Sequence, residues 1–120
     1  MTLRTGIDLC EIRRMVPQLE RQHFLDRVLT PGEQGYLQGK GACRAETLAG
    51  LWAAKEAVLK ALGTGLSLPM TDVEICHDED GAPRCCLAGK AAELAGNASI
   101  SVSISHEAGI AAAVCVMLLP

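Results

Sequence analysis

The residues from 44 to 62 constrain the fold most, because almost all of them favour an α-helix. The Gly63-Thr64-Gly65 sequence that follows supplies the glycine expected just beyond a helix C-terminus. We therefore predict one long helix over residues 44–62. Large apolar residues lie on one side of it, namely Leu48, Leu51, Trp52, Leu59 and Leu62. A separate stripe, spaced i, i+4, i+7 and i+11, places small residues beside two charges and consists of Ala49, Ala53, Glu56 and Lys60.

The segments before this helix predict one strand and further helices. Residues 2–9 are mostly apolar and β-branched, which favours a strand. The helical spacing that follows is interrupted at Pro17, so a broken or two-part helix is expected up to residue 29. Thr30 and Glu33 have the spacing of a capping box, and a second helix is predicted from there towards Gly39.

The segments after the long helix predict two pairs of strands and one short helix. The strands are expected over residues 72–77, 83–87, 99–105 and 109–119, and the helix over residues 90–95. The last two strands are expected to be joined by the turn Ser105-His106-Glu107-Ala108. This order of elements predicts an α+β fold in which a mainly antiparallel sheet packs against helices.

The composition limits the classes of function. A chain of 120 residues fits one domain, 1–120. It has no apolar run of about 20 residues and no cleavable leader, so we expect a cytoplasmic protein that does not enter a membrane. The net charge of −3 argues against nucleic-acid binding. The six cysteines lack the spacings that bind zinc. The mean hydropathy of +0.22 indicates that partner subunits cover some apolar surface.

Polar groups occur in three places where packing alone does not require them: Asp8 in the first strand, Glu56 with Lys60 on the long helix, and His106 in the last turn. Two carboxylates from a strand and a helix can share a hard divalent cation such as Mg²⁺, with water and phosphate oxygens as its remaining ligands. Lys60 would place a positive charge beside the same phosphates. Backbone N–H groups around Gly63-Thr64-Gly65 could donate to them as well.

Each of these residues also has a purely structural interpretation. Asp8 could cap the helix that follows it. Glu56 and Lys60, spaced i, i+4, could form an ordinary solvated ion pair worth a few tenths of a kcal/mol. Gly63 and Gly65 are explained by helix termination, and Ser105 with His106 could simply shape a hairpin turn. The residues taken singly leave both interpretations open.

Three longer motifs favour the functional interpretation of these residues over the structural one. GIDLCEIRR at 6–14, LAGLWAAKEAVLKALGTG at 48–65 and SVSISHEAGIAAAV at 101–114 resemble, in order and spacing, the holo-acyl-carrier-protein synthase family of 4′-phosphopantetheinyl transferases. FLDRVLTPGE at 24–33 and DVEICHDEDGAP at 72–83 are similar to the corresponding segments of that family. The resemblance covers nearly the whole chain. It implies the phosphopantetheinyl transferase fold and transfer of 4′-phosphopantetheine from coenzyme A to a serine of an apo-acyl carrier protein.

The resemblance also implies a role for individual residues. The aspartate of GxD and the glutamate of KEA bind magnesium in this family, which implies Asp8 and Glu56 as metal ligands. In the same family the lysine four residues after that glutamate contacts the coenzyme A pyrophosphate, which implies this role for Lys60. The glycine-rich loop and the serine–histidine pair of the family line the same coenzyme A site. This implies that the residues that contact the cofactor here include Gly63, Thr64, Gly65, Ser105 and His106. A homotrimer with active sites between subunits is implied as well.

The chemistry of the implied reaction agrees with these residues. A carrier serine hydroxyl attacks the β-phosphate of coenzyme A, and adenosine 3′,5′-bisphosphate leaves. Magnesium and Lys60 would stabilise the charge that develops on the pyrophosphate. Glu56, directly or through a metal-bound water, could accept the serine proton.

The first helical region is rich in arginine, at Arg13, Arg14, Arg21 and Arg27. In the family this region docks the acidic carrier, and Arg14 matches its basic docking position. The alternative is a solvated helix face whose arginines pair with Glu11 and Glu20.

One position departs from the family. An arginine that helps to hold coenzyme A phosphate is replaced here by Leu51, and Arg44, about two turns earlier on the same helix, could reach part of that charge. A degenerate module that binds coenzyme A or a carrier protein without catalysis is therefore the alternative function. Retention of Asp8, Glu56 and Lys60 together favours the active transferase.

Overall fold

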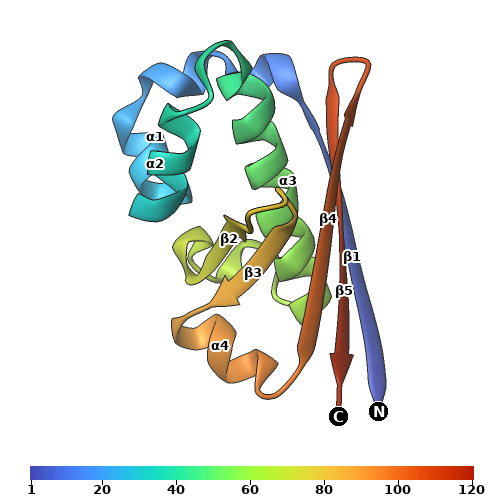
Figure 1. Cartoon of the computed structure of the whole chain (residues 1–120). Coiled ribbons are helices and arrows are strands. Elements are labelled where there is room, and N and C mark those ends of the chain that lie inside the picture. The colour runs from blue at the N-terminus through green and yellow to red at the C-terminus, as the bar shows by residue number, and fades with distance from the viewer.

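A three-stranded sheet with one long helix packed along it forms the centre of the molecule in our computed structural model, which describes residues 1–120. The strands are β1 (Thr2–Glu11), β4 (Ser99–Glu107) and β5 (Ile110–Leu119), and the helix is α3 (Arg44–Leu62). The sheet has the order β1-β5-β4, and both pairs are antiparallel (Figure 1). The first and last strands are therefore neighbours, which places both chain termini at one end of the sheet.

The remaining elements surround α3 away from this sheet (Figure 1). Two α-helices, α1 (Gln22–Val28) and α2 (Pro31–Gln38), lie along the N-terminal half of α3, and a hairpin of β2 (Val73–His77) and β3 (Pro83–Leu87) lies beside it. A short helix, α4 (Gly89–Ala95), leads into β4. Single 3-10 turns connect these elements: η1 (Ile12–Met15), η2 (Pro17–Glu20), η3 (Gly41–Cys43), η4 (Gly65–Ser67) and η5 (Met70–Asp72). No helix is both long enough and apolar enough to cross a membrane.

The predicted α+β fold with antiparallel pairing is confirmed, as are the two strongest helix signals. Helix α3 begins at Arg44 and ends at Leu62, and Gly63 then adopts φ 82°, a left-handed conformation that glycine reaches without strain. Thr30 and Glu33 form the capping box: the Thr30 hydroxyl accepts from the Glu33 N–H, and the Glu33 carboxylate accepts from the Thr30 N–H. This reciprocal bonding satisfies two N–H groups that a helix start would otherwise leave without partners.

Two expectations need correction. The broken helix before residue 29 is α-helical only over Gln22–Val28, because Pro17 begins a separate 3-10 turn after η1. The turn expected at residues 105–108 lies later. Ser105, His106 and Glu107 remain in β4 and pair with Ala112, Ala111 and Ile110, and the reversal takes place at Ala108 and Gly109, both with positive φ.

The sheet is buried on one face only. Alternate residues of β1, β5 and β4 face α3 and belong to the core of 26 buried residues, for example Cys10, Ala111, Ala113, Cys115 and Val102. The opposite face keeps several large apolar side chains between 38% and 65% exposed, namely Leu3, Ile7, Leu9, Val114, Val116 and Leu118. A row of serines along β4, residues 99, 101, 103 and 105, continues that face.

Candidate active site

Asp8 and Lys60 meet at the contact between β1 and the last turn of α3. The Lys60 Nζ atom is 3.1 Å from Asp8 Oδ1 and donates a second hydrogen bond, 2.9 Å long, to the backbone carbonyl of Ile7. The Asp8 side chain is 13% exposed and the Lys60 side chain 50% exposed. The ammonium group is therefore held by the strand while one side of it remains open to a ligand.

Glu56 lies one helical turn before Lys60, on the same side of α3. Burial raises the pKa of the Glu56 carboxyl above its ordinary value, and the negative charge of Asp8 raises it further. Lys60 and Arg14 act in the opposite direction. The charges of Asp8, Lys60 and Arg14 of η1 thus all act on the Glu56 carboxyl.

The two carboxylates provide a donor set that suits a magnesium ion. No group of three or more His, Cys, Asp or Glu side chains forms a complete metal cage anywhere in the structure. Magnesium does not require one, because it retains several water ligands and usually binds through one or two carboxylates together with substrate phosphates. A divalent cation would also relieve the repulsion between Asp8 and Glu56 that raises the pKa of Glu56.

The glycine-rich loop ends α3 next to Lys60. The Gly63 N–H donates to the Lys60 carbonyl at 3.0 Å, and the Thr64 N–H donates to the Leu59 carbonyl at 3.1 Å. The Thr64 hydroxyl also donates to the Leu59 carbonyl. Gly63 and Thr64 thus use their N–H groups to close the helix end, so the loop offers a phosphate fewer backbone donors than the sequence predicted.

Three predicted site residues lie towards the other end of α3. His106 extends from β4 to the helix, where its Nε2 atom is 3.0 Å from the Glu46 carbonyl. Arg44 is the first residue of α3, about 18 Å along the axis from Glu56 at about 1.5 Å per residue. Ser105 alternates with His106 along the pleat and points to the opposite, exposed face of the sheet. A single chain therefore does not bring these three residues to Asp8 and Glu56.

A small cavity of about 190 Å³ lies at this end of α3. It is lined by His106, Thr47, Tyr36 and His77, among others, and by Leu51, the residue that departs from the family pattern. The Leu51 side chain is 1% exposed. The cavity also adjoins Gly50, where an added Cβ atom would lie 3.0 Å from His106 Nε2.

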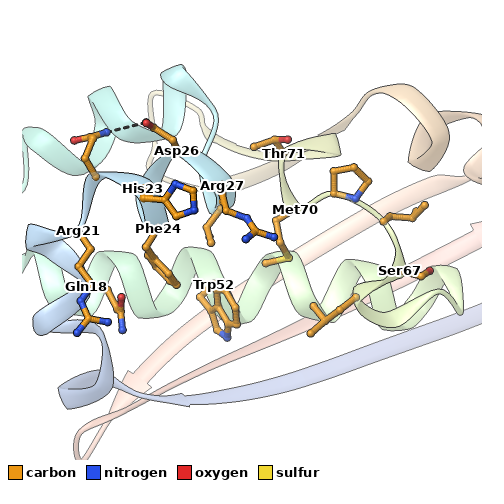
Figure 2. A pocket seen from close by; sticks show the side chains of 15 residues that line it. Gln18, Arg21, His23, Phe24, Asp26, Arg27, Trp52, Ser67, Met70 and Thr71 are labelled. Carbon is orange, nitrogen blue, oxygen red and sulfur yellow. Dashed lines mark hydrogen bonds between the residues drawn. The ribbon is translucent and has the colours of Figure 1, made fainter.

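A larger groove of about 1060 Å³ was not predicted from the sequence (Figure 2). It lies between α1, the η4–η5 segment and α3, and it includes the stacked rings of Phe24 and Trp52, whose centroids are 5.8 Å apart. Arg21 and Arg27 line it as well. The sequence shows only that the chain has a single Phe and a single Trp, 28 residues apart, which does not indicate that their rings stack.

The arginines expected to dock a carrier differ in their surroundings. The charge of Arg14 lowers the pKa of the Glu56 carboxyl, and Arg21 lines the groove. Arg13 is 84% exposed and forms an ion pair with Glu11, 2.9 Å between Nε and Oε2. The solvated ion pair that the sequence left open as an alternative thus describes Arg13 in the structure.

Comparison with known proteins assigns the chain to a family. The sequence profile of the 4′-phosphopantetheinyl transferase superfamily matches residues 4–115. The holo-[acyl-carrier-protein] synthase of Gloeobacter violaceus is 46% identical over 110 residues, which cover 87% of this chain and 83% of that protein. The enzyme of the same name from Verminephrobacter eiseniae is 42% identical over 118 residues, which cover 92% of this chain and 89% of that protein.

Solved structures agree with the sequences. A coenzyme A complex of the synthase from Chronobacterium ammoniagenes superposes with a TM-score of 0.86 at 30% identity, covering 100% of this chain and 99% of that one. The Helicobacter pylori holo-[acyl-carrier-protein] synthase in complex with coenzyme A gives a TM-score of 0.82 at 35% identity. The match covers 94% of this chain and 98% of that one. The chain belongs to the holo-[acyl-carrier-protein] synthase family of the 4′-phosphopantetheinyl transferase superfamily.

Proposed function

We propose that this chain transfers 4′-phosphopantetheine from coenzyme A to a serine hydroxyl of an apo-acyl carrier protein and releases adenosine 3′,5′-bisphosphate. The observation that carries the proposal is the grouping of Asp8, Glu56 and Lys60, which join one strand to one helix with a lysine ammonium open to a ligand. The relatives named holo-[acyl-carrier-protein] synthase, and the structures of relatives with coenzyme A, support the same reaction.

Asp8 and Glu56 would hold a magnesium ion, the cofactor of the proposed reaction. When bound, the ion supplies positive charge that neutralises the pyrophosphate of coenzyme A. Lys60 supports this charge with its exposed ammonium, which the Ile7 carbonyl and Asp8 hold in place. Glu56 is assigned as the group that accepts the serine proton, directly or through a water molecule, because it is the carboxylate that lies one helical turn from the Lys60 ammonium.

The carrier protein is proposed to dock over η1, η2 and α1. Arg14 and Arg21 supply the positive charge that an acidic partner requires, and Arg13 contributes through its exposed guanidinium. The groove with Phe24 and Trp52 includes Arg21 in its lining and adds an apolar surface next to that charge (Figure 2). A carrier docked there would present its serine close to Glu56, which is one turn from Trp52.

The coenzyme A site is proposed to be completed by a second copy of the chain, in a homotrimer. The exposed apolar face of the sheet, defined by Leu3, Ile7, Leu9, Val114, Val116 and Leu118, supports self-association. Ser105 points to this face and can therefore take part in the contact between copies. A neighbouring copy is proposed to supply Ser105, His106 and Arg44 to the coenzyme A site, because none of the three lies near Asp8 and Glu56 in the same chain. The cytoplasmic location expected from the sequence is part of the same proposal.

Mass spectrometry tests the proposed function. Apo-acyl carrier protein is incubated with the chain, coenzyme A and magnesium, and we expect the mass of the carrier to increase by one phosphopantetheine. The variant Glu56→Gln is expected to lose about 100-fold or more in rate, because it removes the proposed base and a metal ligand while keeping the side-chain shape. No mass increase with any carrier, together with identical coenzyme A binding by the variant, would favour the non-catalytic binding module.

A further inference from the structure

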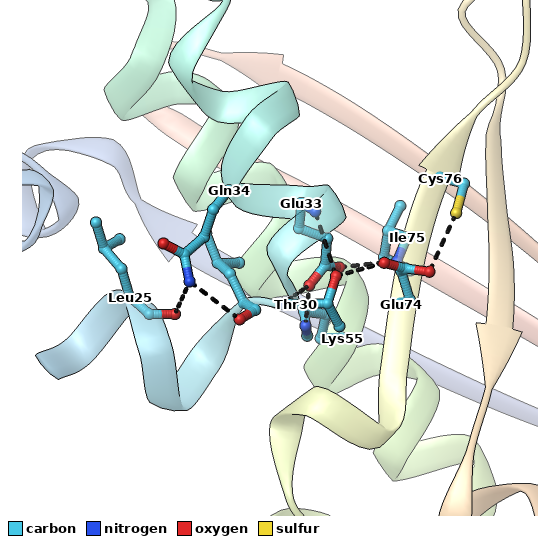
Figure 3. A network of polar contacts seen from close by, with 9 residues as sticks. Leu25, Thr30, Glu33, Gln34, Lys55, Glu74, Ile75 and Cys76 are labelled. Carbon is cyan, nitrogen blue, oxygen red and sulfur yellow. Dashed lines mark hydrogen bonds and ion pairs between the residues drawn. The ribbon is translucent and has the colours of Figure 1, made fainter. Parts of the chain in front are cut away.

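A buried ion pair joins α3 to α2 (Figure 3). Lys55 immediately precedes Glu56, and its Nζ atom donates to Glu33 Oε1. The side chains of both residues are 0% exposed. They are the only charged residues in the buried set of the chain.

The Glu33 carboxylate connects three elements at once. Its Oε1 atom accepts from Lys55 of α3 and, at 2.9 Å, from the Thr30 N–H at the start of α2. Its Oε2 atom accepts from the Ile75 N–H of β2 at 2.8 Å. The Thr30 hydroxyl donates in turn to Glu74 of the same strand. Both carboxylate oxygens are therefore bonded, and Lys55 has a single fixed partner.

Stability alone gives little reason for such a pair. Burial lowers the pKa of the Lys55 ammonium, because desolvation outweighs the favourable effect of the Glu33 charge. Apolar residues of similar volume are often as stable as a buried ion pair, or more so. What a pair of this kind supplies, and an apolar contact does not, is a directional bond that allows one arrangement of the two helices.

The arrangement matters because Lys55 and Glu56 leave α3 in directions about 100° apart. A Lys55 ammonium bonded to Glu33 would restrain the rotation of α3 about its axis, and with it the directions of Glu56 and Lys60. Side-chain ends lie about 5 Å from a helix axis, so a rotation of about 10° moves them by about 1 Å. A displacement of that size at a reacting group can reduce a rate by about 100-fold.

We propose that the Lys55–Glu33 pair is a positioning device that sets the rotation of α3 and so directs Glu56 and Lys60 towards Asp8. Both residues are positioning residues, since neither reaches the substrate. The inference rests on the proposed transferase function. It assigns the lysine of the KEA motif a role distinct from that of the adjacent glutamate.

The test uses the double variant Glu33→Gln/Lys55→Met, which removes both charges and keeps the side-chain lengths. Circular dichroism and denaturant unfolding establish the folded fraction, and kcat and KM for coenzyme A and carrier are measured per folded molecule. We expect kcat to fall about 10- to 100-fold, with both KM values within about threefold of the parent. A folded double variant with the parent kcat would overturn the inference.

Two further variants separate positioning from loss of stability. Val58→Ala removes buried apolar volume from the same helix without touching the pair, and it is expected to lower the unfolding free energy while kcat per folded molecule stays unchanged. If the double variant does not fold, Glu33→Asp replaces it, since it keeps both charges and withdraws the carboxylate by one methylene. An unchanged kcat for Glu33→Asp would then overturn the inference. Failure of the proposed function itself would be recognised separately, because the parent would transfer nothing.

Discussion

Gly6 of β1 lies directly against the backbone carbonyl of Ala57 in α3: a Cβ atom placed on Gly6 would approach that oxygen to 1.9 Å and the Ala61 nitrogen to 2.9 Å. This contact has no room for any side chain, so the glycine of the GxD motif sets how closely strand and helix pack. Asp8 is two residues further on the same face of the strand. The close packing therefore brings its carboxylate within reach of Lys60.

Gly6→Ala is expected to destabilise the fold by about 3 kcal/mol, because a backbone carbonyl cannot move aside as a flexible side chain would. Denaturant unfolding measures this change. The activity per folded molecule should also fall, since separating β1 from α3 withdraws Asp8 from Lys60. Gly35→Ala in α2 is the matched control: an added Cβ atom there meets nothing within 4 Å, so stability should be unchanged or slightly raised. Equal stability of both variants would contradict the proposed packing constraint.

Lys60→Met is expected to separate activity from stability. The Lys60 side chain is half exposed, so losing its bond to Asp8 should change the unfolding free energy by less than about 1 kcal/mol. Losing its charge from the pyrophosphate site should lower kcat/KM by about 100-fold or more. Lys90→Met, which removes an exposed lysine of α4 that lies 4.0 Å from Glu93, should leave both quantities unchanged. A Lys60 variant with near-parent activity would remove this residue from the mechanism.

Local sequence signals were sufficient for the elements that depend on neighbouring residues. The limits of α3 follow from an uninterrupted helix-favouring run and a terminal glycine, and the start of α2 follows from Thr30 and Glu33. The turn near His106 was placed too early, because the alternation that marks a strand continues through Glu107. These polar residues do not end the strand, because Ser105 and Glu107 lie on its exposed face and His106 contacts the Glu46 carbonyl of α3.

Long-range contacts could not be predicted in this way. Lys60 and Asp8 are 52 residues apart. Their polar character suggested a shared metal–phosphate site but left a purely structural interpretation open, and the family resemblance favoured the shared site. The ion pair of Lys55 was missed because its partner lies 22 residues earlier, and nothing in the local sequence distinguishes it from a solvated helix lysine. The groove between α1 and α3 was missed for the same reason: it exists only after both elements have packed.

Val116→Glu is expected to dissociate the proposed homotrimer and lower the activity. Val116 lies at the centre of the exposed apolar face, opposite Thr5 on one side and Ser101 on the other, and is remote from Asp8 in the strand pairing. A buried charge without a partner would oppose association. Sedimentation velocity measures the change in mass. Leu94→Glu, which replaces an exposed apolar residue of α4 away from the sheet, should leave the assembly intact. An assembly unaffected by Val116→Glu would exclude this face as the interface.

Two thiols should make the fold less stable at high pH. Burial raises the pKa of Cys85 to about 12 and that of Cys115 to about 11, whereas an unfolded chain ionises its thiols near pH 9. A raised pKa in the folded state gives stability that is fully present below the unfolded pKa and lost as pH rises through the folded pKa. The unfolding free energy is therefore expected to fall by up to about 1.4 kcal/mol per pH unit for each thiol, from about pH 9 to pH 11 for Cys115 and to pH 12 for Cys85.

Replacing one of the thiols isolates this effect. Cys85→Ala removes one titrating group, so its unfolding free energy should fall less steeply with pH than that of the parent over the same interval. Val73→Ala is the control, because it removes buried volume from the neighbouring strand β2 without removing a titrating group, and its curve should run parallel to that of the parent. Urea unfolding at a series of pH values measures the slopes. Parallel curves for all three proteins would mean that the Cys85 thiol ionises as readily in the folded chain as in the unfolded one, contrary to its burial.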